Sequence, residues 1–280
     1  MRKFKRSIIS KSSSKSSSKK VQSKPIVAPK KATMPQPSFK FPPSIYQKAI
    51  FNEIYNGSGN LIVNAVAGAG KTSTIINAMH FVPSTAKVCF LAFNKLIAEE
   101  LKEKISKNNV DVSTFHSICL KSLFRKRKVN ISSKKNKDII NANIDFMGED
   151  MRPYYGLANR YLGIAKNEGV GVLYKLPNSI ETFNFIQKKH PLHPCASKNI
   201  EGFSLGLLNS FLVHCLDISL KDKFNIDFDD MLLYSLDKGI YFKKYDYIFV
   251  DEVQDLNRIQ IAILKKMIRK GRLIAVGDPK

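Results

Sequence analysis

One short segment limits the possible folds of this chain more than any other: a glycine-rich turn between an apolar run and a helical pattern. Leu61-Ile-Val63 has the composition of a short buried strand, and Ala65-Val-Ala-Gly-Ala-Gly-Lys-Thr72 follows it almost directly. A helical pattern then continues to about Met79. Glycines in the turn let backbone N–H groups face an anion that a side chain would block. The segment therefore predicts a strand, a phosphate-binding loop and a helix, in that order.

The same alternation of strand and helix continues along the chain. A helix is expected from the N-cap Ser44 to Tyr55, because Ile45, Ala49, Ile50 and Ile54 recur at helical spacing. The further expected strands are 88–93, 110–115, 247–250 and 273–276, and the further expected helices are 96–105, from 117 onward, and 258–269. Strands that alternate with helices are typical of a parallel sheet covered by helices. The sequence therefore predicts an α/β fold of the P-loop NTPase class.

The alternation is lost between about Phe124 and Phe224. This stretch has mostly helical patterns and is too long for a loop, which predicts a helical insertion domain over 124–224. The flanking parts, 41–123 and 225–280, would together form the α/β domain. Residues 1–40 are rich in Lys, Ser and Pro and are expected to form a disordered basic tail. The tail could be a nuclear localisation signal, a nucleic-acid-binding arm or a transit peptide, and the sequence does not separate these alternatives.

The formal net charge of +23 points to polyanionic partners, either nucleic acid or an anionic membrane surface. Residues 1–40 contain 12 Lys/Arg and no acid, and residues 41–280 contain 34 Lys/Arg and 23 Asp/Glu, so the body is basic too. The basic runs 121–128 and 134–137 are either solvated faces or contacts to a nucleic-acid backbone. No apolar run reaches the roughly 18 residues that span a bilayer, so no membrane segment is expected.

The cysteines Cys89, Cys119, Cys195 and Cys215 form no C-x-x-C pair and suggest no disulfide framework. An intracellular, reducing compartment is therefore expected, with nucleus and cytoplasm both open. His190, His193 and Cys195 could be metal ligands, but their spacing fits no common zinc pattern. Loop residues and buried helix residues are the favoured interpretation.

A phosphate loop needs an acid that holds the metal at the end of a neighbouring strand. Tyr247-Ile-Phe-Val250 leads directly into Asp251 and Glu252. Asp251 would hold Mg²⁺ through water together with Thr72, and Glu252 would polarise the attacking water as general base. Lys71 would reach the β- and γ-phosphates.

An ordered set of motifs over residues 44–280 resembles the UvrD/Rep-type superfamily 1 DNA helicases. Asp251-Glu-Val-Gln-Asp255 resembles their motif II, and Ala65–Thr72 resembles motif I, in which alanine at position 65 is normal. Leu91–Lys95 resembles motif Ia, and Thr114–Ser117 resembles motif Ib. Asp227–Leu233 resembles the segment before motif II, and Ala275–Pro279 resembles the opening of motif III. Gln47 stands where the Q motif of the family has its glutamine. The versions of motifs Ia and Ib are most similar to the branch that contains the F-box DNA helicases.

The resemblance implies a RecA-like sheet, with ATP and Mg²⁺ as cofactors. Lys71, Glu252 and Gln254 would be catalytic, with Gln254 sensing the γ-phosphate, and Thr72 and Asp251 would hold the metal. The implied nucleotide-binding residues are Gln47, which would read adenine, and Ala65, Val66, Ala67, Gly68, Ala69, Gly70, Lys71, Thr72, Ser73 and Asp278. The implied DNA-binding residues are Phe93, Asn94, Lys95, Thr114, Phe115 and His116.

The resemblance also implies an activity. The chain would belong to a helicase that hydrolyses ATP to move along single-stranded DNA and to unwind partly duplex DNA with 3′→5′ polarity. Motif III of the family continues beyond Lys280, so an N-terminal half is expected, with the second motor domain on a partner chain. The alternative is a catalytically weak, nucleotide-gated nucleic-acid-binding fragment that needs such a partner.

Overall fold

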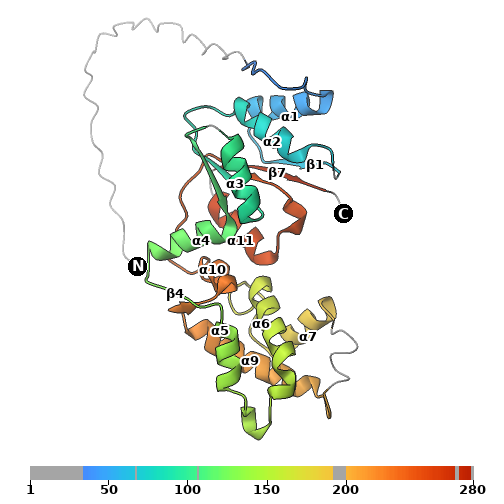
Figure 1. Ribbon diagram of the computed structural model, residues 1–280, viewed down its shortest axis with the longest axis vertical. Helices are drawn as coiled ribbons and strands as arrows, with labels where there is room; N and C mark the ends of the chain where they lie inside the picture. The colour runs from blue at the N-terminus through green and yellow to red at the C-terminus, as the bar shows by residue number, and fades with distance from the viewer. Residues whose placement is uncertain (1–33, 67, 106, 192–199, 269–270, 279–280) are drawn as a thin grey trace, which may run out of the picture. The chain divides into compact units, whose positions relative to one another are not determined.

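The computed structural model describes residues 34–66, 68–105, 107–191, 200–268 and 271–278. In these residues, five strands form one parallel sheet in the order β1-β7-β6-β2-β3 (Figure 1). The strands are β1 (Leu61–Asn64), β2 (Val88–Ala92), β3 (Val110–Thr114), β6 (Tyr247–Val250) and β7 (Arg272–Gly277). Strands β2 and β6 are almost entirely buried, as expected for apolar runs inside a parallel sheet. The predicted α/β fold is confirmed, and every expected strand lies within one residue of its observed bounds.

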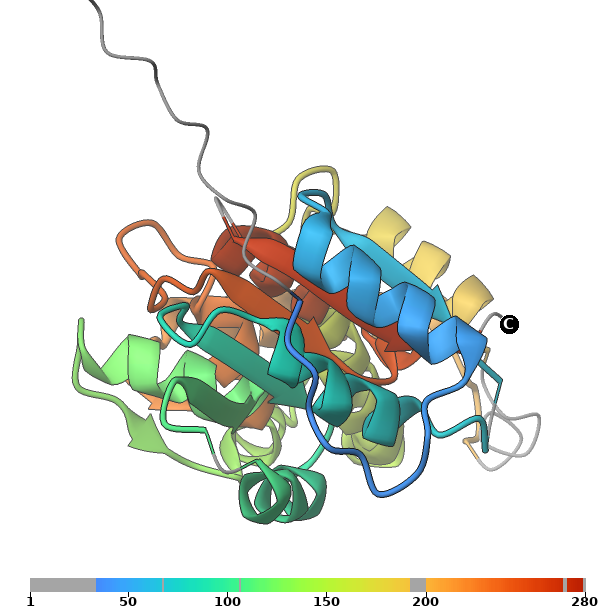
Figure 2. The ribbon, with the colours of Figure 1, turned by 90° about the horizontal axis from the view of Figure 1, so that it is seen from above.

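Helices cover both faces of the sheet. Helices α1 (Ile45–Asn56) and α2 (Lys71–Ala78) lie on one face, and α4 (Phe115–Phe124), α10 (Phe228–Tyr234) and α11 (Arg258–Ile268) lie on the other (Figures 1 and 2). Helix α3 (Lys95–Lys104) packs on β2 and β3. Helix α4 begins at Phe115, earlier than the expected residue 117. The Thr114 hydroxyl accepts the Ser117 N–H at 3.2 Å and so caps the helix two residues further upstream.

Helix α1 forms where the helical spacing predicted it. Ser44 and Gln47 make a reciprocal capping box at its start. The buried face differs from the expected apolar stripe, because Phe51 and Ile54 are buried whereas Ile45 is 74% exposed. The first turn of α1 therefore presents apolar side chains at the surface, next to the glycine-rich loop.

Part of the segment predicted as a tail packs on the α/β domain. The Phe39 ring stacks on Phe51 and Phe81, at centroid separations of 5.6 and 6.4 Å. Phe51 and Phe81 in turn stack on each other at 4.8 Å. Packing thus begins before Phe41, where the sequence placed the start of the domain. Residues 1–33 of the predicted tail lie outside the described residues.

A second apolar core lies within the stretch that the sequence interpreted as an insertion. It is enclosed by α5 (Lys135–Ala142), α6 (Tyr155–Glu168), α7 (Ile180–Lys189) and α9 (Leu205–Lys221), with 3₁₀ turns at Phe146–Gly148 and Arg152–Tyr154. The two-residue strands β4 (Asn130–Ile131) and β5 (Asn225–Ile226) pair in parallel. The chain therefore enters and leaves the helical stretch side by side. None of the helices in the described ranges is long and apolar enough to cross a membrane.

A buried charge network joins the helical stretch to α10. Lys166 Nζ lies 2.6 Å from Asp227 Oδ2 and 3.0 Å from Asp230 Oδ1, and Lys135 Nζ lies 2.7 Å from Asp230 Oδ2. All four side chains are buried. Burial lowers the pKa of Lys135, although the Asp230 carboxylate opposes that shift. Each charge is tolerated here because an opposite charge lies within contact distance.

We expect Lys166→Met to lower the free energy of unfolding by about 3 kcal/mol or more, because it leaves the buried Asp227 carboxylate without its counter-ion and Asp230 with Lys135 alone. Urea denaturation measures this change. The control is Lys188→Met, at an exposed position of α7, which should change stability by no more than about 0.5 kcal/mol. Equal effects of the two variants would contradict a structural role for the network.

Candidate nucleotide-binding site

The loop between β1 and α2 has the conformation and the open space that an anion needs. Gly68 and Gly70 adopt φ values of 77° and 73°, in the left-handed region that favours glycine. A Cβ added at either position would meet no atom within 4 Å, so packing does not require these glycines. Gly70 is the N-cap of α2 and contributes no capping side chain, which leaves the first N–H groups of the helix for a ligand. Ala67, also predicted to bind nucleotide, lies outside the described residues.

Two side chains at the start of α2 contact the acids that follow β6. Lys71 Nζ lies 2.9 Å from Glu252 Oε2, and the Thr72 hydroxyl donates to Asp251 Oδ2 at 2.9 Å. Asp251 is buried at the end of the strand. The structure therefore brings together four residues that the sequence selected, although about 180 positions separate the two pairs in the chain.

Glu252 is held in an unusual conformation. Its φ of 50° lies in the left-handed region, which disfavours a residue with a side chain by roughly 1 kcal/mol. Its pKa is lowered because the Gln254 amide and then the Lys71 ammonium hydrogen-bond to the carboxylate. The same contact with Glu252 raises the pKa of Lys71. The pair is therefore ionised around neutral pH.

Gln254 connects this acid to the end of the neighbouring strand. Its Nε2 donates to Glu252 Oε2 at 2.7 Å, and its Oε1 accepts the Asp278 N–H at 3.1 Å. A Cβ added at Gly277 would collide with Gln254 Oε1 and with Val253. Gly277 is thus a residue of the site that the sequence reasoning missed, and a glycine directly after the apolar run of β7 was the available signal.

Gln47 lies beside the loop, in the first turn of α1. Its Oε1 accepts the Ser44 N–H at 2.9 Å, and its Nε2 donates to the Thr74 hydroxyl at 2.9 Å. A cavity of about 760 Å³ opens next to it, lined by α1, β1 and the glycine-rich loop. Its lining includes Tyr46, Ile50 and Thr74, which no motif indicated, and also the predicted residues Ala65, Val66, Ala69 and Lys71.

The side chains predicted to contact DNA lie at the C-terminal ends of β2 and β3 and in the first residues that follow them, and these two strand ends are adjacent because Ala92 pairs with Thr114. Phe93 is exposed, and the Asn94 side chain caps α3 by accepting the Ile97 N–H at 2.9 Å. Lys95 is exposed, with Glu99 3.6 Å away.

Two predicted DNA contacts next to Thr114 differ in their exposure. Phe115 is only 3% exposed and its ring belongs to the apolar core, and its place along the DNA path stays a prediction. His116 is partly buried with its ring 6.0 Å from that of Phe228, and burial lowers its pKa, so it is neutral at pH 7.

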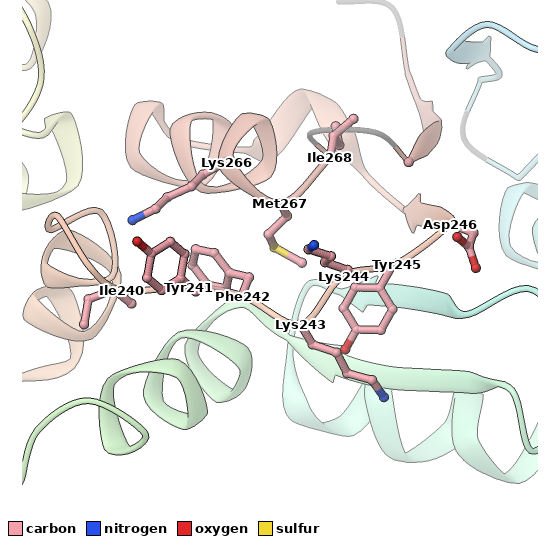
Figure 3. Close-up of a pocket in the computed structure, with 11 residues that line it drawn as sticks. Ile240, Tyr241, Phe242, Lys243, Lys244, Tyr245, Asp246, Lys266, Met267 and Ile268 are labelled. Carbon is pink, nitrogen blue, oxygen red and sulfur yellow. The ribbon is translucent and has the colours of Figure 1, made fainter.

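A second hollow, of about 740 Å³, lies where strand β6 begins, at the sheet edge opposite to the glycine-rich loop. Figure 3 shows Tyr241 beside Phe242 on its wall, with the Lys266 side chain above them. None of the residues predicted to bind nucleotide or DNA lines it. This hollow is therefore separate from the candidate site.

No group of three or more His, Cys, Asp and Glu side chains in the described ranges could hold a metal ion. Cys89, Cys119 and Cys215 are free and buried, and burial raises their pKa to about 12. His193 and Cys195, which the sequence raised as possible ligands, lie outside the described residues. The candidate metal ligands are thus Thr72 and Asp251, a pair that would need further oxygen ligands from phosphate or water.

The lowered pKa of Glu252 predicts how its contacts stabilise the fold at different pH. The ordinary pKa of 4.5 returns on unfolding, so the stabilisation is complete above pH 4.5 and is lost as the pH falls through the lower folded-state value. In denaturation experiments, the stability difference between the wild type and Glu252→Gln should be constant from about pH 7 to about pH 5 and shrink below. Glu103→Gln, at an exposed position of α3, is the control. A difference that stays constant down to about pH 3 would contradict these contacts.

A parallel sheet with a glycine-rich loop between β1 and α2, and with acids after β6 that contact the loop's Lys and Thr, defines a P-loop protein. The family model described as "UvrD/REP helicase N-terminal domain" matches residues 46–280. The chain therefore belongs to the UvrD/REP helicase N-terminal domain family, as the resemblance of its motifs predicted.

Curated relatives agree with this assignment. The chain is 28% identical over 252 residues to a probable DNA helicase II homolog of Mycoplasma genitalium, an alignment that covers 79% of this chain and 34% of the relative. It is 25% identical over 240 residues to the ATP-dependent DNA helicase PcrA of Bacillus subtilis, with 79% and 31% covered. PcrA of Staphylococcus aureus is 25% identical over 254 residues, with the same coverage. The chain spans about a third of the length of the curated relatives that it matches. The similarity to the F-box branch stays a prediction.

Proposed function

We propose that this chain binds ATP with Mg²⁺ in the loop between β1 and α2 and works as the first motor domain of a DNA helicase. The observation that carries the proposal is the pair of contacts Lys71–Glu252 and Thr72–Asp251 at the rim of an open glycine-rich loop. These contacts place a cation, a hydroxyl and two carboxylates where the phosphates of a nucleotide and its metal require them.

The residues fit the proposed ligand at both of its ends. The empty space at Gly68 and Gly70 leaves room for phosphate oxygens against backbone N–H groups. The cavity beside Gln47 is large enough for a nucleobase, and Tyr46 and Ile50 give it apolar walls. Hydrogen bonds with Ser44 and Thr74 hold the Gln47 amide in one orientation beside this cavity.

Each polar residue has a role that follows from its contacts. Mg²⁺, when held by Thr72 and Asp251, would neutralise the charge that develops on the phosphates. Lys71 exchanges its contact with Glu252 for a phosphate oxygen. Glu252, which is ionised at neutral pH even at its ordinary pKa of 4.5, would then accept a proton from the attacking water.

Gln254 is the proposed connection between hydrolysis and DNA. Its amide bridges Glu252 and the Asp278 backbone, so any movement of the Glu252 carboxylate changes a hydrogen bond at the end of β7. Phe93, Asn94, Lys95, Thr114 and His116 would contact single-stranded DNA along the same edge of the sheet. Translocation with 3′→5′ polarity and unwinding are proposed from the resemblance of the motifs.

A second candidate is a nucleotide-gated nucleic-acid-binding protein with weak catalysis. The cavity lining includes Lys71 but no arginine, and an arginine that stabilises the transition state typically accounts for about 10³–10⁵ in rate. In this case a partner chain or a further domain would supply the missing cation. ATP binding without DNA-stimulated turnover by the purified chain would favour this candidate.

We expect ATP with Mg²⁺ to raise the melting temperature of the wild-type chain and to leave that of Lys71→Ala unchanged. Ligand at about 100 times its Kd stabilises the folded state by about 2.7 kcal/mol. Thermal unfolding with a non-hydrolysable ATP analogue separates binding from turnover. The matched control is Lys102→Ala, an exposed lysine of α3, which should respond like the wild type. If Lys71→Ala responded as strongly as the control, the nucleotide site would lie elsewhere.

A further inference from the structure

Basic side chains from three distant segments meet at the C-terminal end of α4. Arg125–Lys128 follow α4 directly, Lys223 precedes β5, and Lys238 follows α10. Arg127 Nη2 and Lys223 Nζ lie 2.7 and 2.8 Å from the same atom, Asp237 Oδ2. A Cβ at Gly239, next to Lys238, would lie 3.6 Å from Lys126 Cε. We call this cluster the α4-end surface.

The positive charge of the α4-end surface is only partly neutralised. Asp237 pairs with two of the six cations, whereas Arg125, Lys126, Lys128 and Lys238 have no ion pair within the described part of the chain. The buried Lys135 and Lys166, by contrast, are both paired with carboxylates. Unpaired like charges repel one another and oppose folding, so this surface is not explained by stability.

Two exposed aromatic rings accompany these charges. Phe124, the last residue of α4, is 53% exposed, and Phe224 is 57% exposed. The Phe224 carbonyl accepts the Asn130 N–H at 2.7 Å, which places Phe224 beside the chain that continues from Lys128. Exposed rings among lysines and arginines form the combination that binds bases by stacking and phosphates by charge.

Helix α4 connects the α4-end surface to the proposed DNA path, and the surface is not itself part of that path. Helix α4 has ten residues and is therefore about 15 Å long. Its N-cap is Thr114, one of the residues proposed to contact single-stranded DNA, and it ends at Phe124. One nucleic acid could therefore reach both ends of the helix.

We propose that the α4-end surface is a second nucleic-acid contact, which binds the phosphate backbone of the DNA that flanks the single-stranded path. The inference rests on the proposed function, because it takes DNA as the ligand. The phosphates are common to duplex and single-stranded DNA, and Phe124 and Phe224 add stacking only where bases are unpaired.

The test measures the binding of two fluorescent DNAs, a duplex with a single-stranded 3′ tail and a single strand of equal length, by anisotropy at several salt concentrations. The charge variant is Arg125→Gln/Lys126→Gln/Lys128→Gln. The matched control is Lys48→Gln/Lys188→Gln/Lys265→Gln, which removes the same charge from exposed positions elsewhere. The slope of log K against log salt should become shallower by up to about 2–3 in the charge variant, since each lost phosphate contact removes about 0.9 on duplex DNA. The slope of the control should stay at the wild-type value.

A second pair of variants separates the two forms of DNA. Phe124→Ala and Phe224→Ala should weaken binding of the single strand by about fivefold or more if its bases stack there, and leave the slope unchanged. An effect confined to the charge variant and larger with the tailed duplex than with the single strand would identify the flanking duplex backbone as the ligand, which also supports the proposal. All substituted side chains are exposed, so circular dichroism and thermal unfolding should match the wild type.

Equal loss of slope in the charge variant and in the control would overturn the proposal, because general charge would then explain binding. No DNA binding by the wild type would overturn it as well, whereas stabilisation by ATP would still support the nucleotide site. Conversely, if ATP failed to bind and the charge variant alone lost salt dependence, the surface would stand and the proposed motor function would not.

Discussion

The contact between Lys71 and Glu252 is the interaction on which the candidate site depends, and the sheet makes it possible. Strand β7 lies between β1 and β6, and adjacent strands are about 4.8 Å apart, so the two residues approach across the end of a third strand. The register pairs Asn64 with Gly277 and Val250 with Ala275, which brings the three strand ends to one edge. A side chain as long as lysine is needed to cross this distance. Gly277 keeps the crossing open, because a side chain there would displace Gln254.

The segment that carries these acids is also fixed to the helical part of the chain. Asn257 Nδ2 donates to Asn167 Oδ1 at 2.8 Å, Asn167 Nδ2 donates to Asp229 Oδ1 at 2.9 Å, and Arg258 Nε lies 3.1 Å from Glu168 Oε2. The last turn of α6 therefore contacts both α10 and the start of α11. Each polar group left without its partner would cost about 1–3 kcal/mol where it is buried, so the helical part cannot separate from this segment without loss of stability.

The sequence predicted the strands and the phosphate loop well, because each depends on local patterns. Apolar runs such as 247–250 can only be buried strands here, and glycines in the loop reflect backbone conformation directly. The buried face of α1 was not predictable from spacing, since aromatic stacking among Phe39, Phe51 and Phe81 decides which side is covered. The burial of the Phe115 ring was not predictable for a similar reason. The motif that contains it shows which residues occur together, but in the helix that Thr114 caps this ring lies in the core, whereas Thr114 and His116 beside it are only partly buried.

Net charge was the least informative part of the sequence until the ion pairs were known. The basic runs 121–128 and 134–137 are both rich in Lys or Arg, yet the structure places some of their cations in different environments. Lys135 is buried, with its ammonium group bonded to Asp230 and to the carbonyls of Ser219 and Asp222, so part of the second run serves the interior of the fold. The residues after Phe124 face outward, and Arg127 alone among them has a carboxylate partner in the described chain. A positive charge that the fold does not neutralise is available to an anionic partner, and this distinguishes the cations that follow Phe124 from the buried Lys135.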